Sequence, residues 1–185
     1  MSTDEVDTTI PVPEKVRFSV RDGVLQAEGP LGKVVRPFPH DALELTASKG
    51  SVKLTLKIPP HRKQSRALLH TWQAHVRNVA GGLTLGVEAR MKVVAAHFPM
   101  KVAAKGETLV IENFLGEKQP RLATLRAGTS ATVEGDIVIL SGFDVEQVGQ
   151  SAANIERTTH IRDYDPRVFQ DGIYLIDRAH VKEAS

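Results

Sequence analysis

The stretch "EGPLGK" (Glu28–Lys33) is echoed later in the chain by "ENFLGEK" (Glu112–Lys118). Both copies place a glutamate, a leucine and a glycine at the same spacing, and about 84 residues separate the two. Self-similarity at a fixed period is typical of a repeated structural unit. The echo therefore predicts that the segments around the two copies fold alike.

The residues around the first copy predict two hairpins and one helix. The segment "RFSVRDGVLQAEG" indicates two strands joined at an Asp22-Gly23 turn, and "ALELTASKGSVKLTLKI" alternates as a second hairpin. Ser65 is a candidate helix cap. Apolar residues at helical spacing then predict a helix through about Val79, which we expect to end at Gly81-Gly82.

The residues around the second copy repeat this plan. "LGEKQPR" takes the place of "GPLGK", and "TSATVEGDIVILSGF" matches the second hairpin, with Gly135 falling on Gly50. We expect "GPLG" to superpose on "FLGE". Asp144 is a helix-cap candidate, followed by an apolar stripe at helical spacing. Each half thus predicts strands, a turn, a hairpin and a single helix.

The predicted fold class is α+β, with two tandem duplicated domains, each a mostly antiparallel β-sheet packed against one main α-helix. We expect a flexible acidic leader over residues 1–11, an N-terminal domain over 12–84, a C-terminal domain over 85–178 and a tail over 179–185. A chain of 185 residues is long enough for two such domains.

Composition excludes several classes of protein. Hydrophobic residues make up 41% of the chain, which suffices for packed cores, but no apolar run has the length of a membrane helix. The polar, acidic start "MSTDEVDTT" lacks the features of a signal peptide. The absence of cysteine rules out disulfides and cysteine-based metal sites. We expect a cytoplasmic protein that contacts no membrane.

The charge distribution is uneven, although the net charge is only +2. Between Glu44 and Glu88 lie 43 residues without an acid, and this stretch holds seven lysines and arginines. A surface that faces a polyanion needs such a lack of carboxylates, because a carboxylate would repel phosphate. A solvated basic face with no partner is the alternative, and charge alone does not decide between them.

We find no constellation of residues for catalysis, metal binding or a cofactor. "EGPLGKVV" lacks the first glycine and the hydroxyl residue of a phosphate-binding loop. His70 and His75 are five positions apart, so they point to different faces of the predicted helix. Asp163 and Asp165 resemble turn caps more than an acid pair. Trp72 falls on the apolar stripe of its helix, and Phe114 is expected to pack on its own sheet.

Two basic clusters stand out in the second half, even though the residues from Val87 onward carry twelve bases against fourteen acids. One cluster, Lys118 and Arg121, follows the Leu115-Gly116 turn; the other comprises three arginines after the second helix. Guanidinium groups and an aromatic ring on an irregular segment suit contact with folded RNA. The candidate RNA-binding residues of the whole chain are Lys57, Arg62, Lys63, Arg66, Lys118, Arg121, Arg157, Arg162, Tyr164 and Arg167.

The segment "RVFQDGIYLIDR" (Arg167–Arg178) resembles the C-terminal signature of the large ribosomal subunit protein six family, in its archaeal and eukaryotic form. That signature is Arg-x-Phe-x-Asp-Gly-Ile-Tyr followed by an aliphatic residue. "VGQSAANIE" and "SRALLHTW" resemble the helices of the same family. The resemblance covers most of the chain and includes the duplication.

The resemblance implies a structural, non-enzymatic protein that supports translation and needs no cofactor, metal or small-molecule substrate. It implies binding to large-subunit (23S-type) rRNA near the sarcin–ricin loop, close to the base of the factor-recruiting stalk, beside neighbouring large-subunit ribosomal proteins. The competing hypothesis is a two-domain protein-binding scaffold with a basic face. Steep salt dependence distinguishes RNA binding from a packed protein interface.

Overall fold

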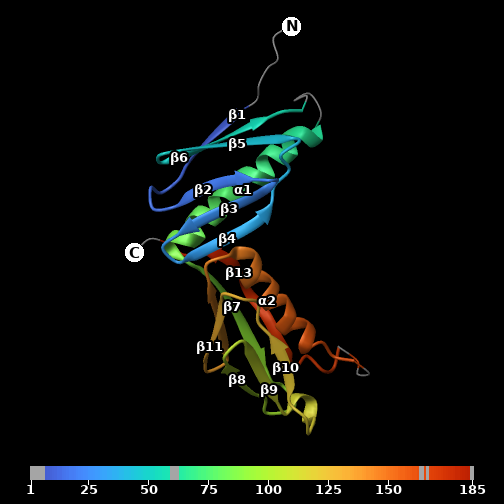
Figure 1. Cartoon of the computed structure of the whole chain (residues 1–185). Helices are drawn as coiled ribbons and strands as arrows, with labels where there is room; N and C mark the ends of the chain where they lie inside the picture. Colours follow the sequence, from blue (N-terminus) through green and yellow to red (C-terminus); the bar gives the residue numbers. More distant parts are fainter. Residues whose placement is uncertain (1–6, 59–62, 163–164, 166, 184–185) are drawn as a thin grey trace. The chain divides into compact units, whose positions relative to one another are not determined.

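The computed structural model describes residues 7–58, 63–162, 165 and 167–183 (Figure 1). The chain separates into two compact units, Met1–Leu85 and Gly86–Ser185. In the described residues each unit combines antiparallel strands with one long α-helix, so the predicted α+β class is confirmed. None of the described helices has the length and apolar character that a bilayer span requires.

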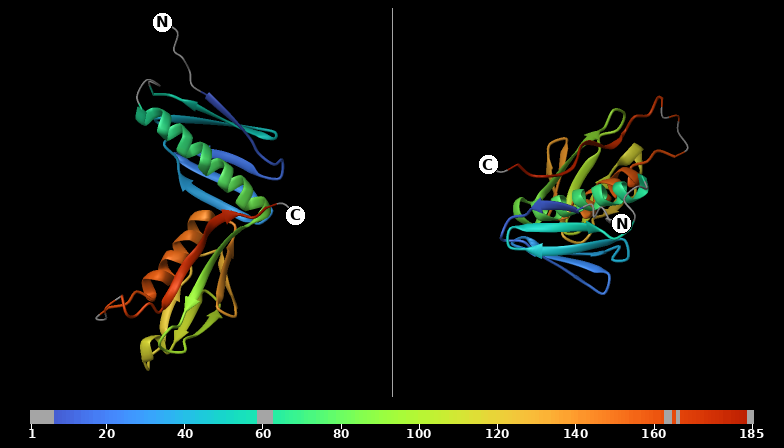
Figure 2. Two further views of the ribbon diagram at one scale, coloured as in Figure 1. Left: turned by 180° about the vertical axis from the view of Figure 1, so that it is seen from behind. Right: turned by 90° about the horizontal axis from the view of Figure 1, so that it is seen from above.

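The first unit contains two three-stranded antiparallel sheets, in the strand orders β1-β6-β5 and β2-β3-β4. Its helix packs against strands of both sheets, and it lies along one side of them (Figure 2). Trp72 of this helix is buried and meets Phe38 edge to face, with ring centroids 4.8 Å apart. The elements are β1 (Asp7–Pro11), β2 (Arg17–Arg21), β3 (Val24–Gly29), β4 (Gly32–Pro37), β5 (Leu43–Ser48), β6 (Ser51–Leu56) and α1 (Lys63–Leu85).

Both hairpins predicted in this unit are confirmed. Asp22 and Gly23 have φ values of 50° and 71°, the conformation that a two-residue hairpin turn of type I′ requires. Lys49 and Gly50 join β5 to β6, and Gly50 has a φ of 79°. An Asp-Gly or Lys-Gly pair between alternating strands was sufficient to locate these turns.

The expected flexible leader over residues 1–11 is wrong for its second half. Residues 7–11 form β1, which pairs with β6 from Asp7 opposite Thr55 to Pro11 opposite Ser51. Ile10 is fully buried, and this burial explains why so polar a segment is held in the sheet. Residues 1–6 lie outside the described part of the chain.

The predicted start and end of the first helix are both wrong. α1 begins at Lys63, so Ser65 is a buried residue inside the helix rather than its cap. The helix continues through Gly81-Gly82 to Leu85, although each glycine costs about 1 kcal/mol relative to alanine. Leu83 is fully buried, and its burial offsets much of that cost. Gly86, with a φ of 84°, then ends the helix.

The second unit contains a four-stranded sheet, β11-β12-β7-β13, and a three-stranded sheet, β10-β9-β8. α2 packs against both sheets. β13 extends to Val181, so residues 179–181 belong to the sheet and not to the expected tail. The elements are β7 (Val87–Val94), β8 (Lys101–Lys105), β9 (Thr108–Glu112), a 3-10 turn η1 (Phe114–Gly116), β10 (Arg121–Thr124), β11 (Thr129–Glu134), β12 (Ile137–Gly142), α2 (Val145–Thr158) and β13 (Gly172–Val181).

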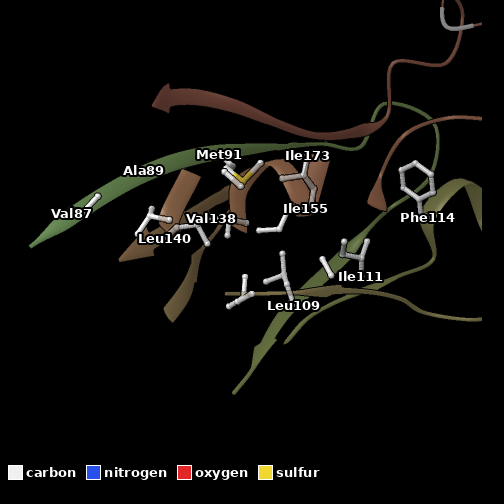
Figure 3. Packing of buried hydrophobic residues seen from close by; sticks show 14 residues of the cluster. Val87, Ala89, Met91, Leu109, Ile111, Phe114, Val138, Leu140, Ile155 and Ile173 are labelled. Carbon is white, nitrogen blue, oxygen red and sulfur yellow. The ribbon is translucent and has the colours of Figure 1, made fainter. Parts of the chain in front are cut away.

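The core of the second unit lies between α2 and the two sheets (Figure 3). Strands β7, β9 and β12, the helix α2 and strand β13 each contribute fully buried side chains, among them Met91, Ile111, Leu140, Ile155 and Ile173. Phe114 from η1 is also buried in this core, as expected. The core therefore fixes the position of the segment that follows α2.

The two units have the same order of strand pairing. β1, β6 and β5 pair as β7, β12 and β11 do, while β2-β3-β4 corresponds to β8-β9-β10, and β13 is an addition to the second unit. By register, however, Gly135 is the first residue of its turn and Gly50 the second, so matching these glycines is wrong by one position. The origin of the units by duplication stays a prediction.

Candidate nucleic-acid interface

The segment that begins in the last turn of α2 carries three of the predicted RNA-binding arginines. Asp144 caps the start of α2, because its carboxylate accepts the backbone N–H of Glu146 at 2.9 Å. Arg157 is exposed in the last turn of this helix, and Arg162 and Arg167 are exposed beyond it. Among the described residues these three guanidinium groups have no ion-pair partner.

A short turn, held by Asp165, orders the part of this segment that contains Arg167. The Asp165 carboxylate accepts the N–H of Arg167 at 2.9 Å, and its carbonyl oxygen accepts the N–H groups of Val168 and Phe169. The expectation that Asp165 caps a turn is confirmed. Asp163 and Tyr164 lie outside the described residues.

Arg121 has an internal role in the second unit. Its guanidinium lies 4.2 Å from the centre of the Phe114 ring and binds Glu117 through two N–H···O contacts of 2.9 and 2.6 Å. A third nitrogen, Nη1, donates to the carbonyl oxygens of Thr158 and His160 at 2.7 and 3.3 Å. Arg121 thereby joins the β9–β10 connection to the C-terminal end of α2, where cations are favoured.

The pairing of Arg121 with Glu117 also affects the charge of the carboxylate. Hydrogen bonding by the Arg121 guanidinium holds the pKa of Glu117 below its usual value, against the opposing effect of burial. Most N–H donors of Arg121 are thus directed at protein atoms. Its positive charge still contributes to the surface, since its side chain remains 25% exposed.

Arg121, Arg157 and Arg162 meet around one shallow depression of about 240 Å³, completed by Thr158 and His160. We call it the basic hollow. The sequence placed Arg121 in a different cluster from Arg157 and Arg162, but the structure brings the three together. No carboxylate lines it among the residues that the structure describes. Lys118 and Arg167 are exposed but do not line the hollow.

The candidate residues of the first unit are less clearly grouped. Lys57 donates to the carbonyl oxygen of His40 at 3.2 Å and lies 4.0 Å from Glu44. Arg66 is exposed in the first turns of α1. Arg62 lies outside the described residues, and of Lys63 only the backbone, at the start of α1, is described. In the sequence these four cations flank the Pro59-Pro60 pair, and that they lie together at one end of the unit stays a prediction.

The first unit also has a depression of about 430 Å³ near the ends of its two sheets. Its lining mixes the cations Arg17 and Lys49 with Glu14 and with apolar residues such as Val12 and Phe18. None of the predicted RNA-binding residues lines it. The mixed charge makes it a poorer match for a polyanion than the basic hollow.

Sequence reasoning missed a partly buried hydrogen-bonded pair, Asp171 and His97, that holds the approach to β13. The Asp171 carboxylate accepts the backbone N–H of His97 at 3.0 Å and lies 2.7 Å from the Nδ1 atom of its ring. The His97 ring in turn packs on Phe169, with ring centroids 4.7 Å apart. The Asp-Gly pair of the signature segment suggests a simple turn, which is wrong, because Asp171 is buried and Gly172 is already the first residue of β13.

The environment of Asp171 stabilises its ionised form. Burial disfavours the charged carboxylate, but hydrogen bonds from the backbone N–H groups of His97 and Phe98 and from the His97 ring outweigh it, and the pKa of Asp171 is lowered. The Asp-Gly pair was visible in the sequence as part of the signature. Its partner could not be identified, because His97 lies 74 positions away.

Side chains at the C-terminal end of α2, from Glu156 and the cap residue Thr159, cover the open edge of β13. The N–H of Ile173 donates to the Thr159 hydroxyl at 3.1 Å, and the N–H of Leu175 donates to the Glu156 carboxylate at 2.9 Å. These contacts satisfy donors that an edge strand would otherwise expose. They also fix the strand that follows the signature segment against the end of α2.

Comparisons with known proteins identify the family of this chain. The family model described as "Ribosomal protein L6" matches residues 98–172. The large ribosomal subunit protein uL6 of Methanosarcina mazei is 42% identical over 95% of this chain and 98% of its own length. The uL6 proteins of Methanobrevibacter smithii and Picrophilus torridus are 41% and 38% identical, over 91% and 90% of this chain and 94% and 92% of their own lengths. The chain therefore belongs to the uL6 family of large ribosomal subunit proteins.

Proposed function

We propose that this chain is a structural protein of the large ribosomal subunit that binds large-subunit (23S-type) rRNA near the sarcin–ricin loop, at the base of the factor-recruiting stalk. Family membership makes it a ribosomal component, acting in translation in the cytoplasm. Beyond family membership, we propose the place on the rRNA and contact with adjacent ribosomal proteins. The basic hollow and the exposed Arg167, later on the same segment after α2, are the observation that carries RNA binding.

The acids of the second unit are compatible with this proposal, because many of their carboxylates are paired with bases or hydrogen-bonded within the unit. Glu117 pairs with Arg121, Glu88 pairs with Arg90 at 2.8 Å, and Asp171 is buried against His97. Asp144 and Asp165 accept backbone N–H groups. The unit's formal charge therefore understates the positive potential near the basic hollow, where Arg157 and Arg162 have no acidic partner among the described residues.

The binding mode that this geometry supports is contact with phosphates and with RNA shape. Arginine presents a planar set of donors that suits phosphate oxygens, and folded RNA is recognised largely through its backbone and its irregular segments. A hollow beside an irregular segment can follow an RNA surface that a flat sheet would not reach. A protein-binding scaffold remains the competing function, and salt dependence separates the two.

The test is the double variant Arg162→Ala with Arg167→Ala, bound to protein-free 23S-type rRNA at a series of salt concentrations. We expect weaker binding and a log–log salt slope that is shallower by about 1 to 2, since each phosphate contact contributes somewhat less than one. Thermal stability should be almost unchanged, because both side chains are exposed. Arg178→Ala, which removes an exposed arginine from β13, is the matched control.

A second experiment addresses the first unit. Reversing the charge of Arg62 and Lys63 should weaken incorporation into the large subunit, because both belong to the acid-free stretch. Unchanged incorporation at high salt would leave the basic face of this unit without an RNA role. If the arginine double variant unfolds while the charge-reversed variant alone loses RNA, the two units have the opposite roles.

A further inference from the structure

A second depression lies beside the basic hollow, and the function just proposed does not use it. Its volume is about 390 Å³, and we call it the aromatic hollow. Phe169, Tyr174, Ile161 and Ile173 give it an apolar lining. The other lining residues are Glu156, Thr159, His160 and Gln170.

The two depressions adjoin at the end of α2. His160 lines both, and successive residues at the C-terminal end of α2 divide between them: Glu156 and the cap residue Thr159 line the aromatic hollow, while Arg157 and Thr158 line the basic hollow. An apolar recess therefore lies next to a cluster of guanidinium groups. A nucleotide is complementary to this pair of hollows, because its flat base suits the apolar recess and its phosphate suits the guanidinium groups.

We propose that the aromatic hollow receives one unpaired base of the RNA, while the phosphate beside that base contacts Arg157 and Arg162 of the basic hollow. This inference rests on the proposed RNA-binding function and adds a base-binding subsite to it. Unstacked bases of folded RNA are recognised by stacking on aromatic side chains and by hydrogen bonds to their edges. The volume lies near the lower end of ligand pockets, which span about 300–1,000 Å³, so it suits one base better than a helix.

The aromatic side chains of this hollow are held in place before any ligand binds. Phe169 packs on the His97 ring, and the Asp171 carboxylate holds that ring through its Nδ1 atom. The hydroxyl of Tyr174 donates to the carbonyl oxygen of Gln170 at 3.1 Å, while 45% of the residue remains exposed. Because these side chains are already ordered, a base would lose little binding energy to ordering them.

Glu156 points to the kind of base that fits. One of its carboxylate oxygens accepts the N–H of Leu175 at 2.9 Å, which fixes the side chain at the hollow. Its second oxygen has no donor among the described residues. A carboxylate accepts hydrogen bonds but does not donate them when ionised. The hollow therefore favours a base with an exocyclic amino group, such as cytosine, adenine or guanine, over uracil, whose one N–H donor lies between two carbonyl oxygens that would face the carboxylate.

The experiment combines binding with base-specific chemical probing, using protein-free 23S-type rRNA of the relative from Methanosarcina mazei. The wild-type protein should protect the edge of one unpaired base from modification. Tyr174→Ala should remove that protection and weaken binding about tenfold, the effect of losing one base–aromatic stack. The salt slope should not change, because no phosphate contact is lost.

Three further variants make the result specific. Tyr174→Phe keeps the ring and should bind like the wild type. Ile176→Ala is the matched control, because Ile176 is exposed on the same strand but does not line the hollow. Glu156→Gln retains an acceptor for Leu175 but places an amide where the second oxygen was, so it should abolish protection of a donor-bearing base. If Tyr174→Ala does not fold, the protection of the base measured with Glu156→Gln tests the base subsite by itself.

The outcomes separate this inference from the function on which it rests. Salt-dependent binding with no base whose protection depends on Tyr174 or Glu156 would overturn the base subsite and leave RNA binding intact. Protection that survives both variants would overturn it equally. Absence of any salt-dependent binding by the wild-type protein would contradict RNA binding itself, whatever the variants do.

Discussion

Replacing Asp171 by asparagine should destabilise the second unit, because Asp171 is the buried partner of His97. Its side chain is only 2% exposed, whereas that of His97 is 36% exposed. Asparagine can still accept the backbone N–H of His97 through its amide oxygen. Its amide nitrogen cannot accept a proton from the His97 ring, so Nδ1 loses its 2.7 Å contact to a charged carboxylate oxygen.

The size of the effect follows from these contacts. A hydrogen bond that involves a charged group contributes about 1.5–3 kcal/mol to stability, so Asp171→Asn should lower the free energy of unfolding by about 2 kcal/mol. Asp171→Ala also leaves buried N–H donors unpaired and should cost about 4 kcal/mol. For a unit of this size, 2 kcal/mol corresponds to a fall of roughly 8–16 °C in the melting temperature.

Circular dichroism and fluorescence can report on the two units separately. Trp72 is the single tryptophan and lies in the first unit, so its fluorescence transition should not shift, while part of the far-ultraviolet dichroism transition moves to lower temperature. Asp177→Asn is the matched control. Asp177 also lies near a histidine, 3.7 Å from His180, but both side chains are about half exposed, so little change is expected.

Acidification tests whether the ionised carboxylate of Asp171 is the source of the lost stability. The pKa of Asp171 is lowered in the folded protein, so its contribution is complete above the unfolded carboxyl value of about 3.9 and is lost as the pH falls through the lower folded value. The difference between wild type and Asp171→Asn should therefore shrink below about pH 4. A difference under about 0.5 kcal/mol at neutral pH, within the range of ordinary surface changes, would refute the reasoning.

Three further predictions concern the framework of the second unit. Arg121→Lys should lose the paired contacts to Glu117 and the stacking on the Phe114 ring. The free energy of unfolding, measured in urea, should fall by about 1 kcal/mol. Asp144→Ala removes the cap of α2 and should cost about 1 kcal/mol, whereas Asp144→Asn should restore most of it. Gly142→Ala would place a methyl group 2.7 Å from a Val148 carbon and 2.8 Å from the Gly128 carbonyl oxygen, and should lower stability by about 2 kcal/mol.

Local features of the fold could be predicted from the sequence because local chemistry determines them. The Asp22-Gly23 turn requires positive φ values, and only a few residue types adopt these readily. The Asp144 cap depends on a carboxylate two positions before the N–H that it accepts. Each of these features is complete within a few consecutive residues.

Features that depend on contacts between distant residues could not be predicted. The extension of α1 through Gly81-Gly82 is set by the burial of Leu83, and β1 is held by pairing with β6. The basic hollow could not be predicted either, since Arg121 and Arg157 meet only because β10 packs beside α2. The sequence indicated which cations to consider, and the fold decided which of them became neighbours.

The position of β7 between β12 and β13 has a consequence for how the chain folds as it is synthesised. Val87 of β7 pairs with Val181 of β13, whereas the first strand of the other unit finds its partner much sooner, with Asp7 opposite Thr55. Pairing across a long separation must wait for the distant segment and closes a large loop, which slows folding. The first unit can therefore complete its sheets while the second still has one side of β7 open. A nascent chain stalled before residue 172 would carry one finished unit and one with an unpaired strand, open to association with another chain.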